Sequence, residues 1–267
     1  MKNNLLDKFY TKPEVAKKCI NLIPNIETYE QIIEPSAGNG SFSNQLNCIA
    51  IDIQPDNKSI QKQDYLKYNF NKTLKTLVIG NPPFGERSNV AKNFIKHSIK
   101  EGAYTIAFIL PNTFKKVGNQ SFSLFPMEWK LILVEELPKD SFFISNGDSY
   151  HVPCSFFVWT RGESNIDLRK KKIEELPDFS FCKRNDKKAD LCVNGNSGKV
   201  KEIFEITNPK AEHFIKAGTK TKEELKNIFS KLEYNRYSSV NGGNYWIGRQ
   251  EILEAYQKFL VDFPNKT

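Results

Sequence analysis

Short apolar segments separated by stretches long enough for a helix are the feature of this 267-residue chain that most restricts its fold. Continuous runs of Ile, Leu, Val and Phe are typical of parallel strands that are buried on both faces of a sheet. Intervening helices then cover those faces. We therefore predict a doubly wound α/β domain with a mostly parallel sheet, its strands formed by residues 31–33, 48–53, 76–80, 103–110, 131–135 and 152–159.

Helix signals lie on both sides of the first strands. Thr11 and Glu14 have the spacing of a capping box, and Pro13 suits the first turn, so we expect Thr11 to cap a helix. Residues 89–100 place apolar side chains on one face and predict another helix. The stretch 40–48 has room for barely two helical turns.

The amino-acid composition changes after Trp159, where charged and turn-forming residues replace apolar runs. We place a boundary near 160–175 and predict domains at 1–165 and 166–267. A capping-box pattern at Thr221 and an amphipathic stretch at 250–260 indicate that the second part folds as a small α+β appendage.

Composition excludes several classes of protein. No segment has the roughly 20 apolar residues of a membrane span, and the first residues lack a signal-peptide layout, so we expect a cytoplasmic protein without membrane contact. We expect no metal and no disulfide framework, because three histidines lie far apart and five cysteines are scattered without a C-x-x-C pair: Cys19, Cys48, Cys154, Cys182 and Cys192.

A glycine-rich turn follows the first predicted strand. Glu34 begins the sequence Glu-Pro-Ser-Ala-Gly-Asn-Gly, in which Gly38 and Gly40 allow a ligand to approach the backbone. The third glycine of a dinucleotide fingerprint is replaced by Ser43. Asp52 ends the next apolar run, where a carboxylate can accept hydrogen bonds from a ribose. A turn-forming acid is the alternative, and the position of Asp52 after the glycine-rich turn favours the ribose.

The sequence Asn-Pro-Pro-Phe at 81–84 directly follows the predicted strand at 76–80. Proline cannot donate to a sheet, so two prolines end the strand abruptly and leave the Asn81 side chain and the Pro82 carbonyl at its tip. Two stiffly held acceptors next to an aromatic ring are suited to an amino group on a planar ligand.

Together, these two motifs resemble those of S-adenosylmethionine-dependent N6-adenine DNA methyltransferases. Residues 7–11, Asp-Lys-Phe-Tyr-Thr, resemble the motif that precedes the cofactor loop in the gamma arrangement of that family. The resemblance covers residues 7 to about 160 and implies a class I, Rossmann-like methyltransferase fold. It implies that S-adenosyl-L-methionine contacts Tyr10, Thr11, Glu34, Pro35, Ser36, Gly38, Gly40, Asp52, Ile53, Asp64 and Tyr65.

The resemblance assigns catalysis to Asn81, Pro82, Pro83 and Phe84. The exocyclic nitrogen of adenine is a poor nucleophile because its lone pair is delocalised into the ring. The Asn81 Oδ1 and the Pro82 carbonyl would accept hydrogen bonds from its two N–H groups and so free that lone pair. The flipped base would stack on Phe84.

Other aromatic and cysteine pairs have ordinary structural interpretations. Pro153-Cys154 superficially resembles the Pro-Cys of cytosine C5 methyltransferases, but it begins a late strand, so a buried core cysteine is favoured. Core packing is likewise favoured for the Phe pairs at 142–143 and 156–157, with a place beside the base pocket as the alternative.

The net charge of +8 is concentrated in the tail, where residues 161–267 contain 21 basic and 16 acidic side chains. We expect double-stranded DNA to contact this tail, although a solvated loop explains the charges equally well. Residues 241–246 are a candidate recognition loop or a plain turn. The predicted phosphate contacts, interleaved with Phe181, His213 and Phe214, are Lys183, Arg184, Lys187, Lys188, Lys199 and Lys201.

The sequence therefore predicts a monomeric, site-specific DNA methyltransferase that modifies adenine N6, with or without a cognate restriction enzyme. Three alternatives stay open: the same chemistry on RNA adenine, methylation of a protein glutamine amide, and a non-catalytic nucleic-acid-binding protein on a methyltransferase scaffold.

Overall fold

The computed structural model describes residues 9–144, 147–174, 176–234 and 246–263. The chain divides into two compact units, residues 1–169 and residues 170–267. The first unit contains all six strands expected from the apolar segments, together with shorter strands at its periphery. Its elements are β1 (Tyr10–Thr11), α1 (Pro13–Asn21), β2 (Gln31–Glu34), β3 (Ile49–Asp52), β4 (Gln61–Lys62), β5 (Thr76–Gly80), α2 (Asn89–Glu101), β6 (Thr105–Pro111), β7 (Lys130–Glu136), β8 (Phe142–Phe143), β9 (Ser149–Tyr150) and β10 (Cys154–Thr160).

The main sheet has seven strands in the order β4-β3-β2-β5-β6-β10-β7. Neighbours from β4 to β6 are parallel, whereas β10 runs antiparallel to both β6 and β7. Strands β5, β6 and β10 are buried along their whole length, which explains their continuous apolar sequences. This is the class I, Rossmann-like methyltransferase fold that the sequence predicts.

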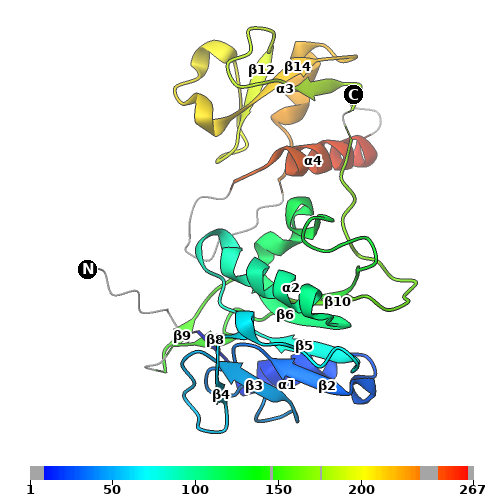
Figure 1. The fold of residues 1–267 in the computed structure, drawn as a ribbon. Coiled ribbons are helices and arrows are strands. Elements are labelled where there is room, and N and C mark those ends of the chain that lie inside the picture. The colour runs from blue at the N-terminus through cyan, green and yellow to red at the C-terminus, as the bar shows by residue number, and fades with distance from the viewer. Residues whose placement is uncertain (1–8, 145–146, 175, 235–245, 264–267) are drawn as a thin grey trace. The chain divides into compact units, whose positions relative to one another are not determined.

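Helix α2 packs against β6 (Figure 1), and Ala91, Phe94 and Ile95 are among its buried residues. Its bounds agree with the helix predicted at 89–100. Between β2 and β3 the chain forms turns instead of a helix, as the short 40–48 stretch allows.

A small sheet in the order β1-β8-β9 joins the start of the unit to a late segment. Thr11 pairs with Phe142 in this sheet, so the prediction that Thr11 caps the first helix is wrong. The cap position is Lys12, whose side chain forms no capping hydrogen bond, and the helix begins at Pro13. The pairing with Phe142 holds Thr11 in the small sheet. Because the helix begins at Pro13, Thr11 is one residue too far from the helix to cap it.

The second unit is an antiparallel sheet with helices packed against it. Phe179, Val193, Ile215, Leu225 and Tyr256 belong to its own buried core. Thr221 and Glu224 form the predicted capping box at the start of α3. The sheet order is β11-β14-β12-β13 (Figure 1), and the elements are β11 (Phe179–Phe181), β12 (Leu191–Asn194), β13 (Val200–Lys201), β14 (Glu212–Ala217), α3 (Lys222–Phe229) and α4 (Arg249–Asp262).

Candidate active site

The two sequence motifs meet at the carboxyl ends of β2 and β5. The chain runs from β2 outward to β3 and β4, then returns to β5 on the other side of β2. The strand order therefore reverses between β2 and β5, which is where open α/β sheets bind ligands. The Ser36 Oγ donates a hydrogen bond to the Asn81 main-chain oxygen at 3.1 Å, so the glycine-rich loop and the Asn-Pro-Pro-Phe segment are in direct contact.

The glycine-rich loop needs its glycines for conformation. Gly38 and Gly40 have φ angles of 55° and 89°, in the left-handed region. The loop is tied to β3 because the Ala37 N–H donates to the Ile51 carbonyl at 2.9 Å. A Cβ at Gly38 would lie 3.3 Å from the Tyr10 ring, so a side chain there would crowd that ring.

Asp52 lies at the end of β3 and holds the glycine-rich loop. Its Oδ2 accepts from the Gly38 N–H at 2.8 Å, and its Oδ1 accepts from the Gln54 N–H at 2.7 Å. Each carboxylate oxygen retains a further lone pair. The neighbouring Ile53 side chain is 49% exposed, so this rim of the site combines a carboxylate with an accessible apolar surface.

Tyr10 and Thr11 reach the same site from the small sheet. The Tyr10 hydroxyl donates to the Asp56 Oδ2 at 2.6 Å, and burial together with this carboxylate raises the pKa of Tyr10. The Thr11 carbonyl accepts from the Ser41 Oγ at 2.6 Å. The Thr11 Oγ1 is buried and has no hydrogen-bond partner in the structure.

Asp56 and Ser41 are site components that the sequence predictions missed, whereas Phe143 was considered as an alternative to core packing. The Phe143 ring lies 5.4 Å from the Tyr10 ring, centroid to centroid. Ser41 directly follows the glycine-rich turn, so its position in the sequence could have indicated that it belongs to the site. Nothing in the spacing indicates Asp56, because its partner Tyr10 is 46 residues away in the chain.

Glu34, at the end of β2, has a buried carboxyl group. Its exposed fraction is 2%. The Ser43 N–H donates to its Oε2 at 2.8 Å, which favours the ionised form, but burial outweighs this bond and raises the pKa of Glu34 to about 7. Pro35 beside it is also buried. Glu34 therefore supports the loop from within the protein.

Asp64 and Tyr65 have structural roles in this arrangement. The Asp64 Oδ1 accepts from the Leu66 N–H at 3.0 Å and caps a short 3-10 helix, Tyr65–Lys67. The Tyr65 ring is in the core, and its hydroxyl is 2.6 Å from the Ser98 Oγ. Tyr65 thus lies apart from the exposed rim formed by Ile53, and the cofactor contacts of both residues stay predictions.

The Asn-Pro-Pro-Phe segment presents one unsatisfied acceptor. The Asn81 Oδ1 is buried and has no hydrogen-bond partner in the structure. Pro82 is buried, Pro83 is exposed, and the Phe84 side chain is only 8% exposed. An unpaired buried acceptor costs roughly 1–3 kcal/mol, so such a group in a native site points to a missing donor.

The connection from Phe84 to α2 is strained. The Phe84 carbonyl accepts from the Val90 N–H at 3.2 Å. Gly85, Arg87 and Ser88 all have positive φ angles, and a Cβ at Gly85 would lie 2.3 Å from the Val90 Cγ2. Strained backbone of this kind is concentrated at functional sites.

Cys154 and three of the four phenylalanines in the two Phe pairs are core residues. Cys154 is buried and burial raises the pKa of its thiol, which does not suit a nucleophile. Phe142, Phe156 and Phe157 are all buried. In the part of the chain that the structure describes, no three His, Cys, Asp or Glu residues are grouped to hold a metal, and no helix is long and apolar enough to cross a membrane.

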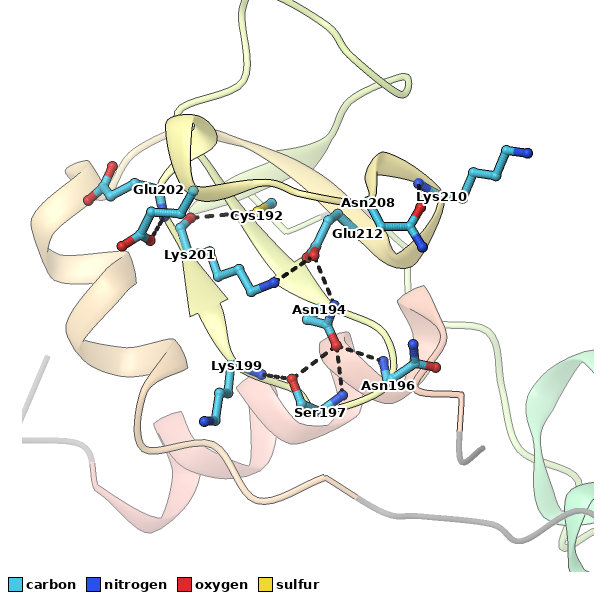
Figure 2. A network of polar contacts seen from close by, with 11 residues as sticks. Cys192, Asn194, Asn196, Ser197, Lys199, Lys201, Glu202, Asn208, Lys210 and Glu212 are labelled. Carbon is cyan, nitrogen blue, oxygen red and sulfur yellow. Dashed lines mark hydrogen bonds and ion pairs between the residues drawn. The ribbon is translucent and has the colours of Figure 1, made fainter. Parts of the chain in front are cut away.

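The predicted phosphate contacts in the second unit fall into two places. The exposed side chains of Lys183, Arg184, Lys187 and Lys188 occupy the turn between β11 and β12. Lys199 and Lys201 belong to the hairpin of β12 and β13. Lys201 is neutralised by Glu212, whose Oε1 is 2.9 Å from its Nζ (Figure 2).

The hairpin of β12 and β13 is stabilised by the polar network in Figure 2. The Asn194 Oδ1 accepts from the N–H groups of Asn196 and Ser197 at 3.1 and 2.9 Å. The Asn194 Nδ2 donates to the Glu212 Oε1 at 2.8 Å. This network explains the hairpin conformation without a ligand. Of the candidate recognition loop, residues 241–245 lie outside the described residues, and the following Trp246 ring packs over Gly195.

Comparison with solved structures finds chains with a similar fold. The chain resembles a candidate RNA methyltransferase from Pyrococcus horikoshii, with a TM-score of 0.44 and 15% sequence identity over 58% of this chain and 85% of that chain. No protein-family model and no curated protein matches the sequence. The fold assignment therefore depends on the strand order and orientation described above.

Proposed function

We propose that this chain transfers a methyl group from S-adenosyl-L-methionine to the exocyclic N6 of adenine in DNA. The observation that carries the proposal is the buried, unpaired Asn81 Oδ1 at the carboxyl end of β5. A base amino group supplies the donor that this oxygen lacks. The methyltransferase fold supports methyl transfer in general, and this acceptor favours an amino nitrogen as the target.

The residues around the glycine-rich loop fit the cofactor. Gly38 and Gly40 give the loop its left-handed turns, and the buried, unpaired Thr11 Oγ1 belongs to a residue that is hydrogen-bonded to Ser41 at the end of the loop. Asp52 and the exposed Ile53 are suited to a ribose and an adenine ring. When bound, the cofactor would supply a methyl group on a sulfonium sulfur, which departs as the neutral thioether, and the methylated N6 would release one proton to solvent.

The chain's own groups then prepare the nucleophile. The Asn81 Oδ1 and the Pro82 carbonyl accept hydrogen bonds from the two N6–H groups. This frees the nitrogen lone pair for in-line attack on the methyl group. Proline rings on both following residues keep these acceptors stiff, so positioning and electrostatics provide the acceleration. We assign Phe84 as the stacking partner for the flipped base, and 8% of this residue is exposed in the structure.

The exposed cations between β11 and β12 favour a nucleic-acid partner. None of these four side chains, Lys183, Arg184, Lys187 and Lys188, forms an ion pair with another described residue. Other lysines of the second unit, Lys170, Lys201, Lys222 and Lys226, are paired with glutamates. Positive charge that the protein leaves unneutralised is available to phosphates, and we assign these phosphates to duplex DNA.

The test is methyl transfer from tritiated cofactor to duplex DNA, single-stranded DNA, RNA and protein, followed by identification of the labelled base or residue. We expect N6-methyladenine in DNA. Label found only in RNA or on glutamine would overturn the DNA assignment. Nucleic-acid binding with no transfer to any acceptor would support the non-catalytic alternative.

Asn81→Ala tests the acceptor directly. Because Asn81 acts on the amino group and lies outside the glycine-rich loop, we expect kcat to fall roughly 100-fold or more while the Kd of the cofactor stays within about twofold. Asn93→Ala is the matched control, because Asn93 is exposed on α2 and away from the motif. Wild-type turnover in Asn81→Ala would contradict the assigned role.

A further inference from the structure

The hydrogen bond between the two motif loops has a consequence for the proposed reaction. Ser36 comes two residues after β2, and Asn81 comes directly after the neighbouring parallel strand β5. The Ser36 Oγ donates to the main-chain oxygen of Asn81 at 3.1 Å. The bond therefore fixes the peptide group that carries Asn81 and leaves the Asn81 Oδ1 unpaired.

This one bond controls the direction of both proposed acceptors. The Asn81 carbonyl belongs to the same planar peptide group as the Pro82 nitrogen. Asn81 is restricted to extended conformations because a proline follows it, and the ring of Pro82 fixes its own φ. Once the Asn81 carbonyl is held, only one backbone rotation separates it from the Pro82 carbonyl.

The surroundings of Ser36 keep it in place for this role. Pro35, the residue before it, is buried, and a Cβ built on Gly80 would lie 3.5 Å from both the Glu34 Cγ and the Pro35 Cδ. The two strand ends are therefore packed against each other beside the hydrogen bond. This packing does not depend on the Ser36 hydroxyl, so removal of the hydroxyl leaves the loops together but frees the peptide to rotate.

We propose that Ser36 is a positioning residue, whose hydroxyl orients the Asn81 and Pro82 acceptors toward the amino group of the target. This inference rests on the proposed function. It gives the Ser36 hydroxyl a role in the chemical step in place of the cofactor contact implied by the family resemblance. A hydroxyl that only contacted the cofactor would change the Kd of the cofactor, whereas a positioning hydroxyl changes kcat.

The experiment compares wild type with Ser36→Ala, Ser36→Thr and Ser36→Cys. The measured quantities are kcat, KM for DNA, the Kd of the cofactor by titration calorimetry, and the thermal midpoint. We expect Ser36→Ala to lower kcat roughly 10- to 100-fold with binding constants within about twofold. Threonine, which keeps the donor, should restore most of the rate, and cysteine, a weak donor, should give an intermediate rate. Ser59→Ala, at an exposed loop position, is the control and should match wild type.

The outcomes separate the two proposals. Transfer by the wild type with an undiminished kcat in Ser36→Ala would overturn the positioning role and leave the proposed function standing. A weaker Kd for the cofactor at unchanged kcat would also overturn it. Absence of transfer by the wild type to any nucleic acid would overturn both. If Ser36→Ala does not fold, the order of rates among serine, threonine and cysteine decides.

Discussion

Glu34 links the pH of the solution to the stability of the first unit. Burial raises the pKa of its carboxyl group to about 7 in the folded protein, against an ordinary value of 4.5. The folded state therefore holds a proton that the unfolded chain loses first. Its contribution to stability is fully present below about pH 4.5 and is lost as the pH rises through 7.

We expect Glu34→Gln to remove this dependence, because glutamine is uncharged and of similar shape. The free energy of unfolding of wild type relative to the variant should fall between pH 4.5 and 7, by at most about 3 kcal/mol. Urea unfolding at pH 5 and pH 8 measures it. Glu27→Gln, at an exposed position, is the control. Parallel pH profiles for wild type and Glu34→Gln would show that the carboxyl is ionised at both pH values.

Individual residues of the site were predictable where a local rule applies to them. Gly38 and Asn81 were found because a turn and a strand end restrict which residues can occupy those places. Thr11 was misassigned as a helix cap and Asp56 was missed, because the partners of both are distant in the chain, Phe142 and Tyr10 respectively. Local sequence rules do not contain such partners.

At the scale of elements, the turn between β11 and β12 has the charge that a phosphate backbone requires. Replacement of both Lys187 and Lys188 by glutamine should weaken DNA binding and reduce the slope of log K against log salt by about 2, since each phosphate contact contributes about 0.9. Fluorescence anisotropy over a salt series measures this slope.

The paired lysines of α3 provide the control for that turn. Lys222 and Lys226 lie 2.6 and 2.7 Å from Glu202 carboxylate oxygens, so their charge is already neutralised. Replacement of both by glutamine should leave the salt slope unchanged. Equal slopes for the two double variants would contradict the assignment of the turn as the phosphate contact.

Elements were predictable from sequence in proportion to their burial. Strands β5, β6 and β10 are buried at every residue, and the apolar runs gave their positions to within two residues. The two-residue strands β1, β8 and β9 were not predicted, because their sequences are too short for a periodic pattern. These short strands bring Tyr10 to the site, so the unpredicted elements complete the candidate active site.

At the scale of the whole molecule, the chain divides after residue 169, inside the 160–175 range in which the composition changes. The Leu168 N–H donates to the Leu131 carbonyl at 2.7 Å, and the Arg169 Nη2 donates to the Trp129 carbonyl at 2.6 Å. The Arg169 guanidinium also lies 5.1 Å from the centroid of the Trp159 ring. These contacts attach the segment to β7 and β10 although its sequence is charged.

Each unit has its own buried core, so we expect fragments 1–169 and 170–267 to fold separately, with cooperative unfolding by circular dichroism. Fragment 1–165 should fold with a free energy of unfolding lower by about 3 kcal/mol, because it lacks the hydrogen bonds and the cation–π contact of residues 167–169. The free energy of unfolding of fragment 1–169 with Arg169→Ala should lie between the values for fragments 1–165 and 1–169. Equal stability of 1–165 and 1–169 would mean that these residues are not part of the first unit.

Since the glycine-rich loop and Asn81 both belong to that unit, fragment 1–169 should also bind the cofactor, whereas tight DNA binding should require residues 170–267.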